Sequence, residues 1–164
     1  MSYLLWATQG QKNGNSERGW ALRVVPSAGA RHCLETYVYI DKVEGITKGL
    51  YRYLPIEDQI IESDMTDDIK ERLNQAMSGQ LYNAAVVFIW TATPYKMEYK
   101  YTTVAHKMIA IEVGHVCQNL YLASESIECG CCAISGYLQK EMDAVVNIDG
   151  EEEFVIYMGV VGKY

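Results

Sequence analysis

The chain has 164 residues, of which 49% are hydrophobic, with a formal net charge of −7 and a pI near 4.9. This length and composition predict one domain with its own core over residues 1–164. The acidic balance argues against nucleic acid or an anionic membrane as a partner, since their binders concentrate Lys and Arg. No apolar run is as long as a membrane span, which needs about 18 residues. The N-terminal residues also lack the basic start of a secretory signal, so a cytoplasmic location is expected.

The first third of the chain is expected to contain a short helix, a loop and two paired strands. Residues 2–10 predict the helix. Residues 10–19 are rich in Gly, Asn and Ser, which favour turns, and predict a mobile polar loop able to cover a binding site. Residues 34–40 and 49–54 are rich in β-branched and aromatic side chains, which is typical of strands, and we expect the two to pair.

A helix and a central strand are predicted in the middle of the chain. Thr66 precedes two acidic residues, a pattern typical of the first turn of a helix. Apolar residues then recur four positions apart until Gly79 stops the run: Ile69, Leu73 and Met77. Residues 84–90 form a continuous apolar run of strand length, which indicates a strand buried on both faces.

Residues 103–126 predict one long helix that is apolar on nearly every side. Such a helix must be buried all round, and in a domain of this size a partner subunit could supply the second layer. Small residues along it would permit close approach: Ala105, Ala110, Gly114 and Ala123. His115 lies in the same segment, where we expect a buried histidine bonded to a backbone carbonyl rather than an acid–base catalyst.

The last third predicts a strand over residues 130–134, a helix over residues 138–146 and a final strand over residues 154–160. Helices and strands therefore mix along the chain without a strict βαβ repeat. This order indicates an α+β fold, in which helices flank a mixed or antiparallel sheet.

Five cysteines, three of them within residues 129–132, do not form the pattern of a secreted disulfide framework. Reduced thiols are the favoured interpretation, and a metal or iron–sulfur centre using Cys117 with this cluster is the rival. Cys131 and Cys132 would point to opposite faces of a strand, and no second CxxC-type pair completes four ligands. Packing of small residues is therefore favoured, and no metal is expected.

Two stretches of small residues carry the strongest functional signal. They are residues 26–31 (PSAGAR) and residues 114–120 (GHVCQNL), the second running into the Gly- and Cys-rich residues 129–136. Residues with little side chain let main-chain N–H groups reach a flat or anionic ligand. Either stretch alone is more often a plain turn, but the two together, in this order and at this separation, suggest a flavin site.

Taken in order, these segments resemble the nitroreductase superfamily of FMN-dependent oxidoreductases, and within it the streptolysin-type dehydrogenases that oxidise thiazolines and oxazolines in peptides. The likeness covers nearly the whole chain, through residues 2–10, 23–32, 34–38, 49–53, 100–101, 114–119 and 149–152. It implies a nitroreductase-like fold, an intertwined homodimer with flavins at the interface, and hydride transfer through flavin N5 to or from a small-molecule or peptide substrate.

The resemblance also implies which residues hold FMN. It assigns the loop of Pro26, Ser27, Ala28 and Gly29 to the isoalloxazine ring, which needs donors along its edge. Gly130 and Cys131 would pack on the ring from the other side through their backbone. Four cations are candidates for the phosphate, with Arg23 the first choice: Arg23, Arg31, Lys107 and Lys163.

Lys100 and Tyr101 match the pair implicated in catalysis in the thiazole- and oxazole-forming dehydrogenases. Azoline oxidation removes a carbon-bound proton while a hydride goes to the flavin, so a base is needed near the ring. The other interpretation is structural, because residues 95–101 also read as an amphipathic entry to the long helix.

The sequence departs from the family pattern at three points, one of which is that it stops at Lys163 and Tyr164, where many superfamily members continue into a basic tail. Family members usually carry an Arg-x-Ser-x-Arg segment that grips the FMN phosphate, upstream of anything present here, so the chain is expected to be an N-terminally shortened form. Cys33 stands where a Pro is usual. These departures leave three functions open.

The first is an FMN-dependent oxidoreductase that dehydrogenates peptide azolines or reduces nitro or quinone compounds with NAD(P)H. The second is a flavin-free family scaffold that acts as a binding or regulatory protein. The third is a thiol or metal centre at the cysteines of residues 129–132.

Overall fold

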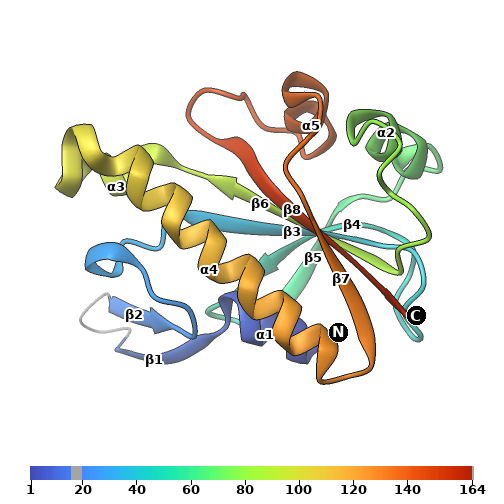
Figure 1. The fold of residues 1–164 in the computed structure, drawn as a ribbon, viewed down its shortest axis with the longest axis horizontal. Coiled ribbons are helices and arrows are strands. Elements are labelled where there is room, and N and C mark those ends of the chain that lie inside the picture. The colour runs from blue at the N-terminus through green and yellow to red at the C-terminus, as the bar shows by residue number, and fades with distance from the viewer. Residues whose placement is uncertain (16–19, 164) are drawn as a thin grey trace.

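A computed structural model describes residues 1–15 and 20–163 of the chain. At its centre lies a six-stranded sheet in the order β5-β4-β3-β6-β8-β7, in which the neighbouring strands are antiparallel (Figure 1). Its strands are β3 (Leu34–Ile40), β4 (Gly49–Leu54), β5 (Gln59–Asp64), β6 (Val86–Ala92), β7 (Cys129–Ile134) and β8 (Phe154–Lys163). A second, two-stranded sheet pairs β1 (Gln11–Asn15) with β2 (Trp20–Arg23).

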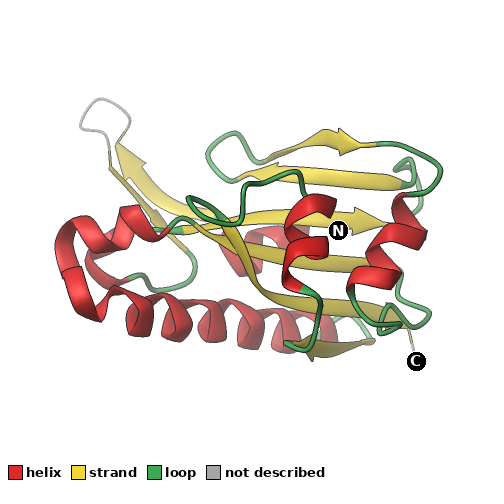
Figure 2. Ribbon diagram, turned by 90° about the horizontal axis from the view of Figure 1, so that it is seen from above, coloured by secondary structure: helices red, strands yellow, loops and turns green. Residues whose placement is uncertain are grey.

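The described residues also form five α-helices and two single 3-10 turns. The helices are α1 (Ser2–Gln9), α2 (Ile69–Ala76), α3 (Pro94–Tyr101), α4 (Ala105–Glu125) and α5 (Gln139–Val145), and the turns are η1 (Ala28–Ala30) and η2 (Thr102–Val104). In Figure 2, α4 runs along the length of the sheet. The expected α+β class is confirmed. None of the helices in the described ranges has the length and hydropathy needed to cross a bilayer.

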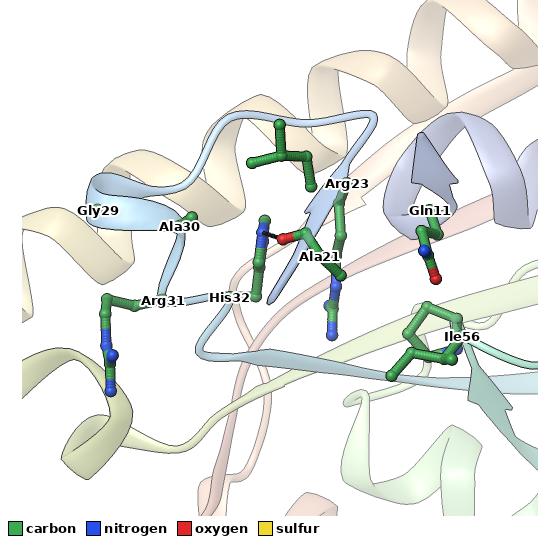
Figure 3. Close-up of a pocket in the computed structure, with 10 residues that line it drawn as sticks. Gln11, Ala21, Arg23, Gly29, Ala30, Arg31, His32 and Ile56 are labelled. Atoms are coloured by element: carbon green, nitrogen blue, oxygen red, sulfur yellow. Dashed lines mark hydrogen bonds between the residues drawn. The ribbon is translucent and has the colours of Figure 1, made fainter. Parts of the chain in front are cut away.

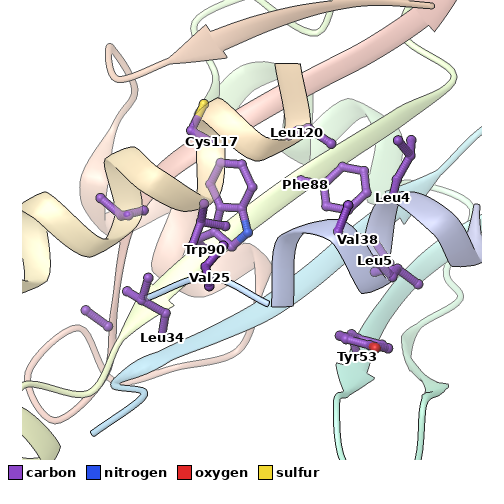
Figure 4. Packing of buried hydrophobic residues seen from close by; sticks show 14 of the residues in the cluster. Leu4, Leu5, Val25, Leu34, Val38, Tyr53, Phe88, Trp90, Cys117 and Leu120 are labelled. Carbon is purple, nitrogen blue, oxygen red and sulfur yellow. The ribbon is translucent and has the colours of Figure 1, made fainter. Parts of the chain in front are cut away.

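The two faces of the central sheet hold separate cores, and β6 contributes to both. Phe88 and Trp90 pack into the core beneath α1 and α4, as Figure 4 shows, whereas Val87 and Ile89 belong to the core beneath α2 and α5. Because side chains alternate between the faces of a strand, a strand covered on both faces must be apolar at every position. The continuous apolar run therefore predicts the central position of β6 correctly.

Only one face of α4 is buried within the chain. Residues spaced three and four apart, such as Ile109, Val113 and Val116, pack against the sheet. On the opposite side Ile111 is 46% and Leu122 63% exposed, and His115 is also exposed. Among the described residues of the single chain, nothing covers this side of α4, and His115 on it is exposed rather than buried. Burial of the helix all round by a partner subunit therefore stays a prediction.

Three further differences from the sequence prediction have local causes. Residues 11–15 form strand β1 rather than loop, because they pair with β2; residues 16–19 of the predicted mobile loop lie outside the described residues. Strand β5 was not predicted, since it is an edge strand with few buried side chains. Helix α3 is separate from α4 because Thr102, with φ 44°, interrupts the helical backbone between them.

Candidate functional site

The first part of the candidate site is a tight turn after β2, within what we name the 26–33 loop (residues 26–33). The N–H of Ala30 donates to the Ser27 carbonyl at 3.0 Å, and the N–H of Arg31 donates to the Ala28 carbonyl at 3.3 Å. Gly29 has a φ of 59°, which a glycine adopts without steric cost. The turn leaves Pro26 and Gly29 exposed, so the small residues noted in the sequence do present backbone at the surface.

A buried carboxylate on α4 joins this loop to the body of the protein. One Glu112 oxygen, Oε1, accepts hydrogen bonds from Ser27 Oγ at 2.8 Å and from the Ala28 N–H at 2.6 Å. Its other oxygen, Oε2, accepts from the Cys33 thiol at 3.5 Å. Ser27 Oγ in turn accepts from the His32 N–H at 2.8 Å. The Ser27 hydroxyl and the Ala28 amide, both expected to face a flavin, thus have partners inside the chain.

Glu112 was missed by the sequence reasoning, although a signal for it exists. It is an acidic residue on the apolar face of α4, and its side chain is only 5% exposed. A carboxylate is seldom buried without partners, so an acid within an apolar helical stripe indicates hydrogen-bond donors close by.

The predicted pair Lys100 and Tyr101 lies beside the same loop, at the end of α3. A methyl group on Gly29 would lie 2.7 Å from Lys100 Nζ and 2.7 Å from Tyr101 Oη. The Lys100 ammonium also lies 5.5 Å from the centre of the Tyr101 ring. The fold therefore brings together Gly29, Lys100 and Tyr101, which are about 70 positions apart in the chain, at one point of the surface.

Arg23 and His32 border a cavity of about 400 Å³ on the hairpin side of the loop, together with Gly29 and Arg31 (Figure 3). Arg23 Nη1 donates to Gln9 Oε1 at 2.7 Å and to the Leu34 carbonyl at 2.9 Å. Burial lowers the pKa of Arg23, an effect that neighbouring acidic groups only partly oppose. The pKa of His32 is lowered as well, mainly by burial and also by the charge of Arg23.

The remaining predicted cofactor residues lie elsewhere in the protomer. Gly130, Cys131 and Lys163 border a cavity of about 280 Å³ where β7 begins and β8 ends. Of the cavities described, none is lined by both this group and the 26–33 loop. Lys107 is exposed on the first turn of α4 and lines neither of these two cavities. One protomer therefore divides the predicted residues into two separate groups.

Three thiols are poor nucleophiles: Cys33 and Cys117, which are buried, and Cys131, which is half-buried. Burial, reinforced by Glu112, raises the pKa of Cys33 to about 12, and burial raises the pKa of Cys131 to about 12 and that of Cys117 to about 11. A thiol with such a pKa stays protonated at neutral pH and neither attacks nor ligates readily. Within the described residues, no group of three or more His, Cys, Asp or Glu side chains could hold a metal ion.

Comparison with known proteins places the chain in a family. The sequence matches the nitroreductase family over residues 1–163, and the chain therefore belongs to it. A Methanocaldococcus jannaschii protein named as a nitroreductase is 29% identical over 165 residues, which cover 99% of this chain and 79% of that protein.

Solved structures show the same fold at lower identity. A protein of Anabaena variabilis named as a nitroreductase superposes with a TM-score of 0.87 at 24% identity, and the match covers 99% of this chain but 34% of that one. A chain of the E. coli microcin synthetase complex McbBCD, solved with truncated pro-MccB17 bound, gives a TM-score of 0.83 at 19% identity, with coverages of 99% and 62%. This chain thus spans about a third of the first structure and slightly less than two thirds of the second.

Proposed function

We propose that this member of the nitroreductase family is an FMN-dependent oxidoreductase that dehydrogenates azoline rings in a peptide substrate. The observation that carries the proposal is the meeting of Gly29, Lys100 and Tyr101 at an exposed turn. The likeness of the fold to a chain of the microcin synthetase complex, which was solved with a truncated pro-peptide bound, supports a peptide as the substrate. One solved structure with the same fold is named as an FMN-dependent nitroreductase, which supports the choice of cofactor.

The residues of the 26–33 loop fit a flat cofactor. Gly29 lacks the Cβ that would fill the space in front of Lys100 and Tyr101. Gly29 exposes its backbone, and Pro26 exposes an apolar side chain. FMN, when bound, takes up a hydride at N5. In this proposal the loop of Pro26, Ser27, Ala28 and Gly29 holds the ring, Gly130 and Cys131 pack on it, and Arg23, Lys107 and Lys163 are the candidates for the phosphate.

Lys100 and Tyr101 would carry the proton transfer. Loss of hydride from an azoline carbon must be coupled to loss of a proton, so a base has to lie near the reacting carbon. We assign Lys100 Nζ as the group that accepts this proton. Tyr101 Oη, close to Nζ in front of Gly29, would orient the amine and the substrate.

A homodimer would unite the two groups of residues that one protomer keeps apart. The uncovered face of α4 carries exposed apolar side chains, among them Ile111 and Leu122, and a second copy would bury them. Sedimentation velocity of the purified protein should show a dimer, and replacement of Leu122 by Glu should shift it towards the monomer. A native chain that sediments as a monomer at all concentrations contradicts this part of the proposal.

Absorption spectroscopy and one pair of variants test the function. The purified protein, with and without added FMN, should give a stoichiometric flavin spectrum. Lys100→Ala should keep that spectrum and lose azoline oxidation. The matched control Lys140→Ala, which alters an exposed lysine on α5 at the opposite face of the sheet, should keep both.

Full azoline oxidation by Lys100→Ala would refute the catalytic assignment. NAD(P)H-dependent reduction of a nitroaromatic or quinone, with no azoline oxidation, would instead favour the broader family reaction.

A flavin-free scaffold is the second candidate, and one observation favours it. The donors assigned to FMN already have partners within the chain: Ser27 and Ala28 are bonded to Glu112, and Arg23 is bonded to Gln9 and Leu34. A colourless protein that does not change the spectrum of added FMN would support this candidate, in which the chain acts as a binding or regulatory partner.

A further inference from the structure

Glu112, on α4, accepts three hydrogen bonds from the 26–33 loop. Among the described residues, no other side chain of α4 does so. The partners of this carboxylate, Ser27, Ala28 and Cys33, lie 79 to 85 positions earlier in the sequence. A buried carboxylate that lacked these donors would cost much free energy, so the arrangement favours one loop conformation over alternatives.

The backbone of the loop requires such a constraint. Ala30 has a φ of 53° and His32 a φ of 47°, both in the left-handed region that residues with a Cβ disfavour. Conformations of this kind persist only where the surrounding structure imposes them. Glu112 fixes the start of the turn through Ser27 and Ala28, and the Ser27 hydroxyl fixes its end through the His32 N–H.

We propose that Glu112 is a positioning residue, which sets the shape of the 26–33 loop and thereby places Gly29 against Lys100 and Tyr101. The proposal rests on the proposed function for its link to FMN, but the positioning itself concerns residues of this chain alone. Glu112 has no part in proton or hydride transfer. It acts through Ala28, whose N–H it binds and which directly precedes Gly29.

Two substitutions at Glu112 separate hydrogen bonding from bulk. Glu112→Gln keeps one acceptor oxygen for Ser27 and Ala28, whereas Glu112→Ala removes every acceptor. We expect Glu112→Ala to weaken FMN binding on the order of tenfold to a hundredfold, the range for loss of charge-assisted hydrogen bonds, and Glu112→Gln to restore most of the affinity. Equal loss in both variants contradicts a positioning role.

Cys33 supplies a readout that needs no cofactor. Its side chain is fully buried against Glu112 Oε2, and Cys117 is a second buried thiol, on the same helix as Glu112. The alkylation rate of each thiol, followed by peptide mass spectrometry without FMN, reports local opening once the charge effect is removed. Ser27→Ala removes it, because this variant breaks the loop contact but keeps the Glu112 carboxylate that raises the pKa of Cys33. In Glu112→Ala we expect Cys33 to react on the order of tenfold faster or more, with Cys117 unchanged.

The outcomes keep the two proposals distinguishable. If the native protein binds no FMN, the proposed function fails, and a faster Cys33 in Ser27→Ala, with an unchanged Cys117, still supports the positioning role. An unchanged Cys33 rate in Glu112→Ala overturns that role whatever FMN does. If Glu112→Ala does not fold, Ser27→Ala tests the same contact from the loop side, and it should also accelerate Cys33 without affecting Cys117.

Discussion

Gly29 and Lys100 lie so close together that no methyl group fits between the Gly29 backbone and the Lys100 ammonium. A Cβ at position 29 would lie 2.7 Å from Lys100 Nζ, and Gly29 also has a φ of 59°. Glycine at this position therefore serves two purposes, since it permits the left-handed backbone and leaves room for the lysine tip. The contact between the 26–33 loop and the end of α3 depends on both.

Replacement of Gly29 by Ala should separate Lys100 and Tyr101 from the loop. The new methyl group meets only the ends of two flexible side chains, which can move away. We therefore expect a loss of stability of about 1–2 kcal/mol from the positive φ alone, together with a large loss of azoline oxidation. Urea unfolding and an activity assay on the FMN-loaded protein measure the two effects.

Gly45→Ala is the matched control for this substitution. Gly45 has a φ of 79°, and a Cβ there would meet no atom within 4 Å. Its variant should lose the same about 1–2 kcal/mol and keep full activity. Equal activity in the Gly29 and Gly45 variants would mean that the approach of Lys100 to the loop has no part in catalysis.

Arg23→Met should lower the free energy of unfolding and should weaken the binding of FMN relative to that of riboflavin. The substitution keeps an apolar stem but leaves Gln9 Oε1 and the Leu34 carbonyl without their donor, at a cost of about 1–3 kcal/mol. If Arg23 also contacts the phosphate of FMN, binding of FMN should weaken about tenfold, whereas binding of riboflavin, which has no phosphate, should not.

Lys107→Met provides the comparison, because Lys107 is exposed and lies outside the Arg23 cavity. It should leave the free energy of unfolding unchanged. Equal weakening of FMN and riboflavin by Arg23→Met would assign Arg23 a structural role only.

Glu35 should make the stability depend on pH in the acidic range. Burial tends to raise its pKa, but the Lys96 ammonium at 2.5 Å, together with Arg23 and Arg52, outweighs this and lowers the pKa below its usual value. A carboxylate with a lowered pKa in the folded state stabilises the protein above its unfolded-state pKa, and this contribution disappears as the pH falls through the folded-state pKa.

The difference in unfolding free energy between the native protein and Glu35→Gln should thus be largest near about pH 7 and shrink steadily towards about pH 3. Denaturant titrations across this range measure it. Glu98→Gln, at an exposed position on α3, serves as the control and should show little difference at any pH. A constant gap for Glu35→Gln would contradict the ion-pair explanation.

Much of the fold could be predicted because its buried elements leave a periodic signal. The apolar run of β6 and the four-residue spacing of Ile69 and Leu73 both follow from burial, and both elements are present. Strands β1 and β5 escaped prediction because backbone pairing, rather than burial, holds polar edge strands.

The candidate site was predictable only in part. Lys100 and Tyr101 were identified through a resemblance, yet nothing in their spacing indicates that they reach Gly29. That contact depends on how α3 packs beside the loop, which is a tertiary property. Glu112 left a local signal, a charge on an apolar face, but its three donors come from a distant segment and could not be named from the sequence.

Gly159→Ala should disturb the packing of β8 beneath α4. A Cβ at Gly159 would lie 2.6 Å from Leu120 Cδ2 and 3.4 Å from Trp90, both fully buried, so the helix or the indole must shift. Overpacking of this kind costs about 1–3 kcal/mol.

Gly162→Ala, on the same strand, is the matched control. A Cβ there would meet its nearest neighbours at 3.7 Å, an ordinary contact, so the variant should be nearly neutral. Because α4 also carries Glu112, we expect only the Gly159 variant to accelerate alkylation of Cys33. Equal free energies of unfolding for the two variants would contradict the predicted overpacking at Gly159.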